Sequence, residues 1–161
     1  MINLNDLYLP PPFCGEQCTD LKYFASAMDE VDLSPSYQRG PRWTREQQEA
    51  FMGHLIQGGH VNPIIVQRVP DKGGGEVLDG KQRTLAILAW LAGSVGARID
   101  DGRVIYRRDV TGGLARVEIR IKYINLPFEE RKRFYVRFNS AGATHTREEL
   151  DAALRAQPKG V

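Results

Sequence analysis

The turn at residues 79–83 combines residue types that proteins use to hold phosphate. It contains Asp79, Gly80, Lys81, Gln82 and Arg83. An apolar stretch precedes it and a helical pattern follows, which predicts a strand-to-helix junction. The unpaired N–H groups of a helix start favour an anion, and the planar guanidinium of Arg83 suits phosphate. Asp79 is expected either to hold Mg²⁺ beside the phosphates or only to cap the helix.

Two other segments carry polar residues that could complete such a site. Residues 35–43 place Gln38 and Arg39 between Tyr37 and Trp43. The aromatic pair is expected in the core, and the amide and guanidinium are the candidates for contact with phosphate. Residues 137–144 place Asn139 at the end of a helical pattern and before small residues, which let a backbone approach a ligand closely. The alternative for Asn139 is an ordinary turn between two helices.

The three segments together resemble the N-terminal domain of GmrSD-type modification-dependent restriction enzymes. The likeness lies in their order and spacing over about residues 30–155. That domain is related to the nucleotide-binding domain of ParB. The resemblance implies an α+β, ParB/sulfiredoxin-like fold with a small mixed sheet and flanking helices. It also implies a site for a nucleoside triphosphate with Mg²⁺ on Asp79. Asp79 and Arg83 are the implied catalytic residues. The implied phosphate contacts are Gln38, Arg39, Gly80, Lys81, Gln82, Arg83 and Asn139.

The implied function is NTP hydrolysis or phosphotransfer linked to DNA restriction, modification or partition. A non-catalytic DNA-binding or adaptor module is the alternative, and a stand-alone nuclease ranks below both, because no carboxylate or histidine pair has the spacing of a nuclease metal site. Lys81 stands where the family commonly has glutamine, which adds positive charge. The chain is expected to be a stand-alone version without a His-Asn-His nuclease domain, and sulfiredoxin's reactive cysteine is missing from the turn.

The composition is typical of one globular domain. The chain has 161 residues, of which 42% are hydrophobic and 26% charged, and its net charge is +2. Basic residues gather in two stretches, and either could face a nucleic-acid backbone or only solvent. The first comprises Arg103, Arg107, Arg108, Arg116, Arg120 and Lys122, and the second Arg131, Lys132, Arg133 and Arg137. Besides nucleotide and DNA, a separate effector protein or a second copy are the expected partners.

Three further features concern location, metal binding and nucleotide binding. No stretch is long and apolar enough to cross a bilayer and no secretory leader is visible, which predicts a cytoplasmic protein with no membrane partner. Cys14 and Cys18 are expected to be ordinary thiols in a loop, and a zinc half-site with His54 or His60 is the alternative. Residues 75–81 match part of the P-loop pattern, but Gln82 stands where Ser or Thr should bind magnesium, so that motif is rejected.

The expected layout is an irregular arm at residues 1–19, a domain at 20–156 and a frayed tail at 157–161. A capping box at Thr44 and Gln47 predicts a helix over 45–57, which Gly58 ends. Residues 63–69 and 76–78 are expected to form a hairpin. The next helix, after Gly80, is expected to bury Leu85, Leu88, Ala89 and Ala92.

The second half is expected to open with a hairpin turn at 100–102 and a half-buried antiparallel strand at 116–123. Pro127 suits the first turn of a helix. The expected face of that helix is Arg131, Phe134, Tyr135 and Phe138. A loop at 139–145 is expected before a second capping box at Thr146 and Glu149, which predicts a final helix.

Overall fold

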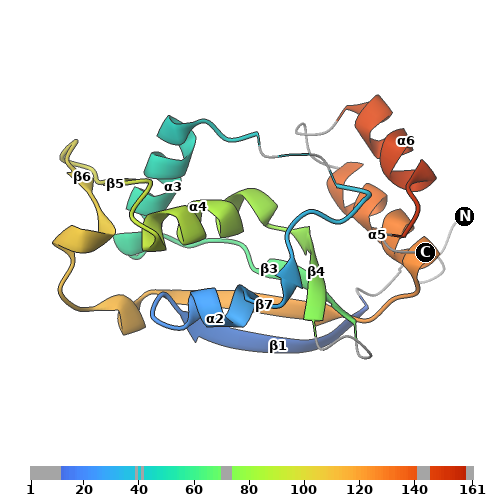
Figure 1. Cartoon of the computed structure of the whole chain (residues 1–161), viewed down its shortest axis with the longest axis horizontal. Coiled ribbons are helices and arrows are strands. Elements are labelled where there is room, and N and C mark those ends of the chain that lie inside the picture. Colours follow the sequence, from blue (N-terminus) through green and yellow to red (C-terminus); the bar gives the residue numbers. More distant parts are fainter. Residues whose placement is uncertain (1–11, 39, 41, 70–73, 141–145, 159–161) are drawn as a thin grey trace, which may run out of the picture.

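A five-stranded mixed sheet forms the centre of the computed structural model (Figure 1). The structure describes residues 12–38, 40, 42–69, 74–140 and 146–158. In spatial order the strands are β1 (Phe13–Asp20), β7 (Glu118–Ile124), β3 (Ile64–Val69), β4 (Gly74–Asp79) and β2 (Val31–Asp32). β1 pairs antiparallel with β7 and β3 antiparallel with β4, whereas β7 with β3 and β4 with β2 are parallel. The mixed sheet and its flanking helices confirm the predicted α+β class.

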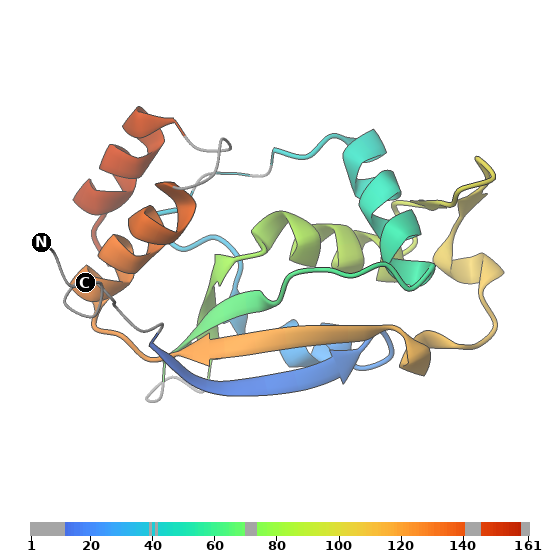
Figure 2. The same cartoon turned by 180° about the vertical axis from the view of Figure 1, so that it is seen from behind.

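Helices cover the sheet in two groups. The larger hydrophobic cluster joins α2 (Phe24–Met28), α3 (Arg45–Ile56) and α4 (Lys81–Leu91) to strand residues that include Ile64, Val77 and Ile121. The smaller cluster joins α5 (Phe128–Ser140) and α6 (Arg147–Arg155) to Ile65, Leu78 and Ile124. Figures 1 and 2 show α5 and α6 side by side at one end of the molecule, with α3 toward the other.

Local sequence signals set several element boundaries. Both capping boxes form, since Thr44 accepts from the Gln47 N–H at 3.3 Å and Thr146 from the Glu149 N–H at 3.3 Å. α3 ends where Gly58 takes a φ of +86°, which glycine adopts without strain. β5 (Ala97–Arg98) and β6 (Val104–Ile105) form the expected hairpin, and two 3₁₀ turns follow, η2 (Arg107–Asp109) and η3 (Leu114–Arg116).

The expectation of an irregular arm up to residue 19 is wrong for residues 13–19, which belong to β1. Gly15 coincides with an irregularity in the β1–β7 register, so the glycine interrupts the pairing without ending the strand. Cys14 and Cys18 therefore lie on an exposed strand and not in a loop. β7 shows the expected alternation of burial, but it is antiparallel only toward β1.

The predicted inner face of α4 is wrong, and that of α5 is right for Phe134 and Tyr135 but not for Phe138. α4 buries Lys81, Thr84, Ala86, Ile87 and Trp90, while Leu85, Leu88 and Ala89 are only partly buried. A helix that is apolar on most sides gives no single periodic stripe, so neighbouring elements select the inner face. On α5, Phe138 is 46% exposed, whereas Lys132 is only 3% exposed because its Nζ donates to the carbonyls of Leu154 and Ala156 at the end of α6.

Candidate functional site

The start of α4 is the centre of the candidate site. Gly80 precedes the helix with a φ of +91°, and a Cβ there would lie 3.0 Å from Ile64 Cγ1. No side chain caps this helix, so the expectation that Asp79 caps it is wrong. The first intrahelical bond runs from the Thr84 N–H to the Gly80 carbonyl, and a helix start leaves the N–H groups of Gln82 and Arg83 without an intrahelical acceptor.

Arg83 is held by three acceptors. Its Nη2 donates to Asp79 Oδ2 at 2.5 Å, and its Nη1 donates to the carbonyls of Asn62 and of Pro63, the latter at 3.3 Å. The Arg83 side chain is only 16% exposed. Arg83 thus places a positive charge at the start of α4, and it also ties the loop between α3 and β3 to the end of β4.

Gln38 and Gln82 bring two of the predicted segments together. Gln38 Nε2 donates to the carbonyls of Val77 at 2.5 Å and Leu78 at 2.9 Å, in the strand that leads to the turn. Gln82 Oε1 accepts from the backbone N–H groups of Arg42 at 3.0 Å and Trp43 at 3.2 Å. Gln38 is therefore held against the end of β4, and Arg42 and Trp43 against the start of α4. Arg39, the other candidate in this segment, lies outside the described residues.

Lys81 and Asn139 are placed differently from the other candidates. Lys81 is buried, and its Nζ donates to Ser34 Oγ at 3.3 Å. Asn139 belongs to α5, which continues through Ser140, so the expected loop does not begin at residue 139. The side chain of Asn139 and residues 141–145 lie outside the described part of the chain.

Sequence reasoning missed Arg42 and Glu149. Arg42 Nη2 forms an ion pair with Glu149 Oε1 and so joins the segment at 38–43 to α6. The Arg42 side chain is 57% exposed, which leaves its guanidinium accessible from solvent. The available signals were that Arg42 is a second basic residue in this segment and that Glu149 is the acidic member of a capping box.

A largely buried polar network holds Tyr37, the residue before Gln38. The Tyr37 hydroxyl donates to Glu76 Oε2 at 2.9 Å, and Arg131 Nη1 donates to the same oxygen at 2.5 Å. Tyr37 also packs edge-on against the rings of Phe128 and Tyr135, and it belongs to the core as expected. Burial raises the pKa of Tyr37 well above its ordinary value, and the Glu76 carboxylate adds to this rise.

We expect the free energy of unfolding to fall as the pH rises above about 10, the ordinary tyrosine pKa. Above that pH the unfolded chain releases the Tyr37 proton while the folded chain keeps it, so the unfolded state binds fewer protons and is favoured. Urea unfolding from about pH 8 to pH 11 would measure this. Tyr37→Phe should show a shallower fall than Tyr23→Phe, whose ring is 56% exposed. Equal falls in the two variants would contradict the assignment.

The residues present do not by themselves form a magnesium site. Across the described residues, no three His, Cys, Asp or Glu side chains gather as a metal would require. Asp79 offers one carboxylate, and Arg83 already donates to it. Mg²⁺ usually keeps several waters and combines one or two carboxylates with substrate phosphates. A magnesium ion would therefore bind here only together with the phosphates that it coordinates.

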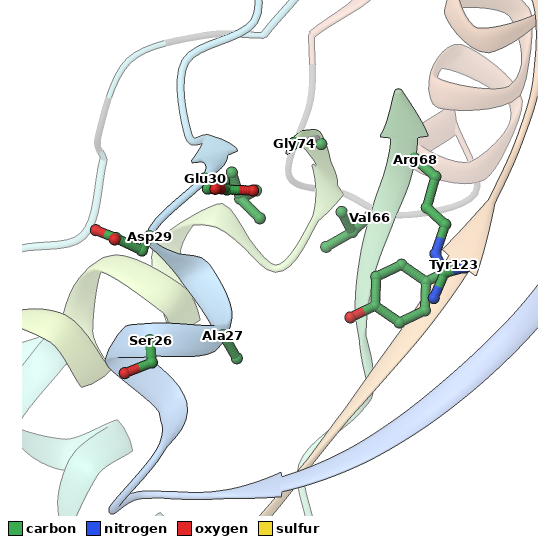
Figure 3. Close-up of a pocket in the computed structure, with 10 residues that line it drawn as sticks. Ser26, Ala27, Asp29, Glu30, Val66, Arg68, Gly74 and Tyr123 are labelled. Carbon is green, nitrogen blue, oxygen red and sulfur yellow. The ribbon is translucent and has the colours of Figure 1, made fainter. Parts of the chain in front are cut away.

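A pocket of about 440 Å³ lies elsewhere, between the end of α2 and the strands β3, β4 and β7 (Figure 3). Arg68 lies over the Tyr123 ring at 4.3 Å on one side of it, and Asp29 and Glu30 lie on the other. A Cβ at Gly74 would lie 2.3 Å from the Glu30 carbonyl oxygen, which requires glycine at this strand start. The lining includes none of the predicted site residues.

Comparison with known proteins decides the family. A family model described as the GmrSD restriction endonuclease, N-terminal domain, matches residues 22–157. The chain belongs to this family. No curated protein matches it.

Among solved structures, the chain is similar to C-terminally truncated chromosome-partitioning protein ParB from Caulobacter crescentus, complexed with CTP-gamma-S. The identity is 16% and the TM-score 0.47, and the match covers 81% of this chain and 56% of the ParB chain. The chain thus spans little more than half of that ParB structure. Within the described part of this GmrSD N-terminal domain, no helix has the length and apolar character needed to span a bilayer.

Proposed function

We propose that this GmrSD N-terminal domain binds the phosphates of a nucleoside triphosphate at the start of α4, in a process linked to DNA restriction or modification. The observation that carries the proposal is that Arg42 and Trp43 are bonded to Gln82 at one uncapped helix start. The N–H groups of Gln82 and Arg83 and the helix dipole favour an anion there. The guanidinium of Arg42, on the adjoining segment, adds an exposed cation suited to phosphate.

The predicted phosphate contacts divide into two roles in this proposal. Gln38, Gln82 and Arg83 use their side chains on protein groups, so they shape the site and position its backbone. Arg39 and Asn139 are proposed as further contacts, and Lys81 supplies charge from beneath. Mg²⁺ would arrive with the nucleotide.

Hydrolysis is the finer part of the proposal. Water would attack the terminal phosphorus, the bridging P–O bond would break toward the diphosphate, and the Asp79 carboxylate would accept the proton of the water. Arg83 would hold that carboxylate in place through its 2.5 Å contact. Asp79→Asn should then lower phosphate release at least about 100-fold, within the range that acid–base groups contribute, while nucleotide affinity changes little. Unchanged phosphate release would exclude Asp79 as the base.

Calorimetric titration with ATP, CTP, GTP and UTP, with and without Mg²⁺, tests binding itself. Arg83→Ala should lower affinity at least about tenfold, or 1.4 kcal/mol, because the positive charge and the loop anchor are both lost. Arg98→Ala is the matched control, since Arg98 also contacts one carboxylate, that of Glu49, at 2.6 Å. Thermal unfolding of both variants separates stability from binding. Wild-type protein that binds none of the four nucleotides would overturn the proposal.

A further inference from the structure

A second, smaller pocket carries positive charge that the candidate site does not use. It has a volume of about 270 Å³ and lies between the turn after α3 and the start of β7. Its polar lining comprises Gly58, Gly59, His60, Arg116, Glu118 and Arg120. The lining thus contains two arginines, one histidine and one carboxylate.

The two arginines are available to a ligand. Both side chains are exposed, and neither forms an ion pair or hydrogen bond with another group in the described part of the chain. Glu118 supplies the one carboxylate of the lining, against two guanidinium groups. The pocket therefore has an excess of positive charge.

The wall opposite the arginines has a defined shape. Gly58 takes its positive φ there, and a Cβ at Gly59 would lie 2.2 Å from the ring of His54. The His54 ring folds over this turn, with Nε2 3.0 Å from the His60 carbonyl oxygen. The same loop continues to Asn62 and Pro63, whose carbonyls accept from Arg83. One loop thus borders both the second pocket and the candidate nucleotide site.

We propose that this pocket binds backbone phosphates of duplex DNA through Arg116 and Arg120, with His60 at its edge. The inference rests on the DNA-linked role proposed above. Exposed guanidinium groups bind phosphate with a planar pair of donors, and because both arginines lie at the surface, the phosphates of a long polyanion can reach them. Free nucleotide phosphate has the same chemistry, so the experiment must separate the two sources.

The test compares two double variants of the full chain that remove equal charge. Arg116→Gln with Arg120→Gln removes the pocket's guanidinium groups, and Arg103→Gln with Arg108→Gln is the control, at side chains 71% and 78% exposed. Fluorescence anisotropy would measure binding of a labelled mixed-sequence duplex over a range of salt concentrations. The slope of log K against log salt should decrease by about 1.8 in the first variant, at 0.9 per phosphate contact, and much less in the control.

The outcomes separate this inference from the proposed function. Equal losses in both double variants would show only an effect of net charge and would overturn the pocket assignment. Lower affinity for nucleotide, with duplex binding unchanged, would assign the pocket to free nucleotide and also overturn it. Wild-type protein that binds no duplex would refute the DNA-linked role itself. Wild-type protein that binds duplex with the slope unchanged in the first variant would refute only this inference.

Discussion

Glu76→Ala is expected to lower the free energy of unfolding by about 3–5 kcal/mol, because it leaves the Arg131 guanidinium buried without a counter-charge. The Arg131 side chain is 11% exposed and that of Glu76 23%. Arg131 Nε already has no hydrogen-bond partner in the described part of the chain, so the remaining contacts must offset its desolvation. The Tyr37 hydroxyl would lose its acceptor as well.

Urea unfolding of wild-type and variant protein would measure this loss. Tyr37→Phe is the milder comparison, expected to cost about 1 kcal/mol, since one hydrogen bond is removed and the ion pair stays. A double variant, Glu76→Met with Arg131→Met, should be more stable than Glu76→Ala because no charge is left buried. A Glu76→Ala protein within about 1 kcal/mol of wild type would contradict the role given to this ion pair.

Glu76→Ala is also expected to weaken nucleotide binding. Glu76 joins Tyr37, in the segment next to Gln38, to Arg131 in α5. Loss of the network should loosen Gln38 and, beyond it, Arg42 and Trp43, which donate to Gln82 at the start of α4. Nucleotide affinity is therefore expected to fall even at temperatures where Glu76→Ala remains folded.

Gly53→Ala is expected to lower the free energy of unfolding by about 3 kcal/mol or more. This is the upper end of the range for residues too large for the space around them. Alanine in the middle of a helix ordinarily stabilises it by about 1 kcal/mol relative to glycine. Here a Cβ would lie 1.7 Å from the carbonyl oxygen of Arg98, a backbone atom of β5 that no rotamer change can move. The clash outweighs the better helix propensity of alanine, because α3 and β5 would have to separate.

Thermal unfolding would detect a fall of about 6–12 °C for such a loss in a chain of this size. Gly58→Ala is the matched control, since a Cβ there meets no atom within 4 Å and only the positive φ opposes it. The left-handed backbone conformation should lower the free energy of unfolding of Gly58→Ala by about 1–2 kcal/mol. A Gly53→Ala protein as stable as Gly58→Ala would show that α3 and β5 can move apart at little cost in free energy.

Much of the fold was predictable where the signal is local. The capping boxes at Thr44 and Thr146, the stop at Gly58 and the hairpin turn at 100–102 depend on neighbouring residues only, and all four are confirmed. The inner face of α4 and the burial of Lys132 on α5 were not predictable in this way. Lys132 is buried because α6 places its terminal carbonyls within reach, which no pattern within α5 encodes.

At the turn at residues 79–83, too, the sequence predicted the local structure but not the contacts of the side chains. Its position between a strand and a helix, and its likeness to the family now matched over residues 22–157, came from the sequence. The roles of its side chains did not. A motif names an arginine and a glutamine, but only their surroundings decide that Arg83 holds two carbonyls and that Gln82 holds two backbone N–H groups.

By itself the sequence determined the family, the α+β class and the helix starts, because these depend on residue type, order and short spacing. Only the tertiary structure decided which polar side chains face one another. Pairs such as Arg42 with Glu149 and Glu76 with Arg131 are more than 50 residues apart in the chain. Long-range packing of helices against the sheet brings them together, and a sequence pattern read over a few turns contains no record of that contact.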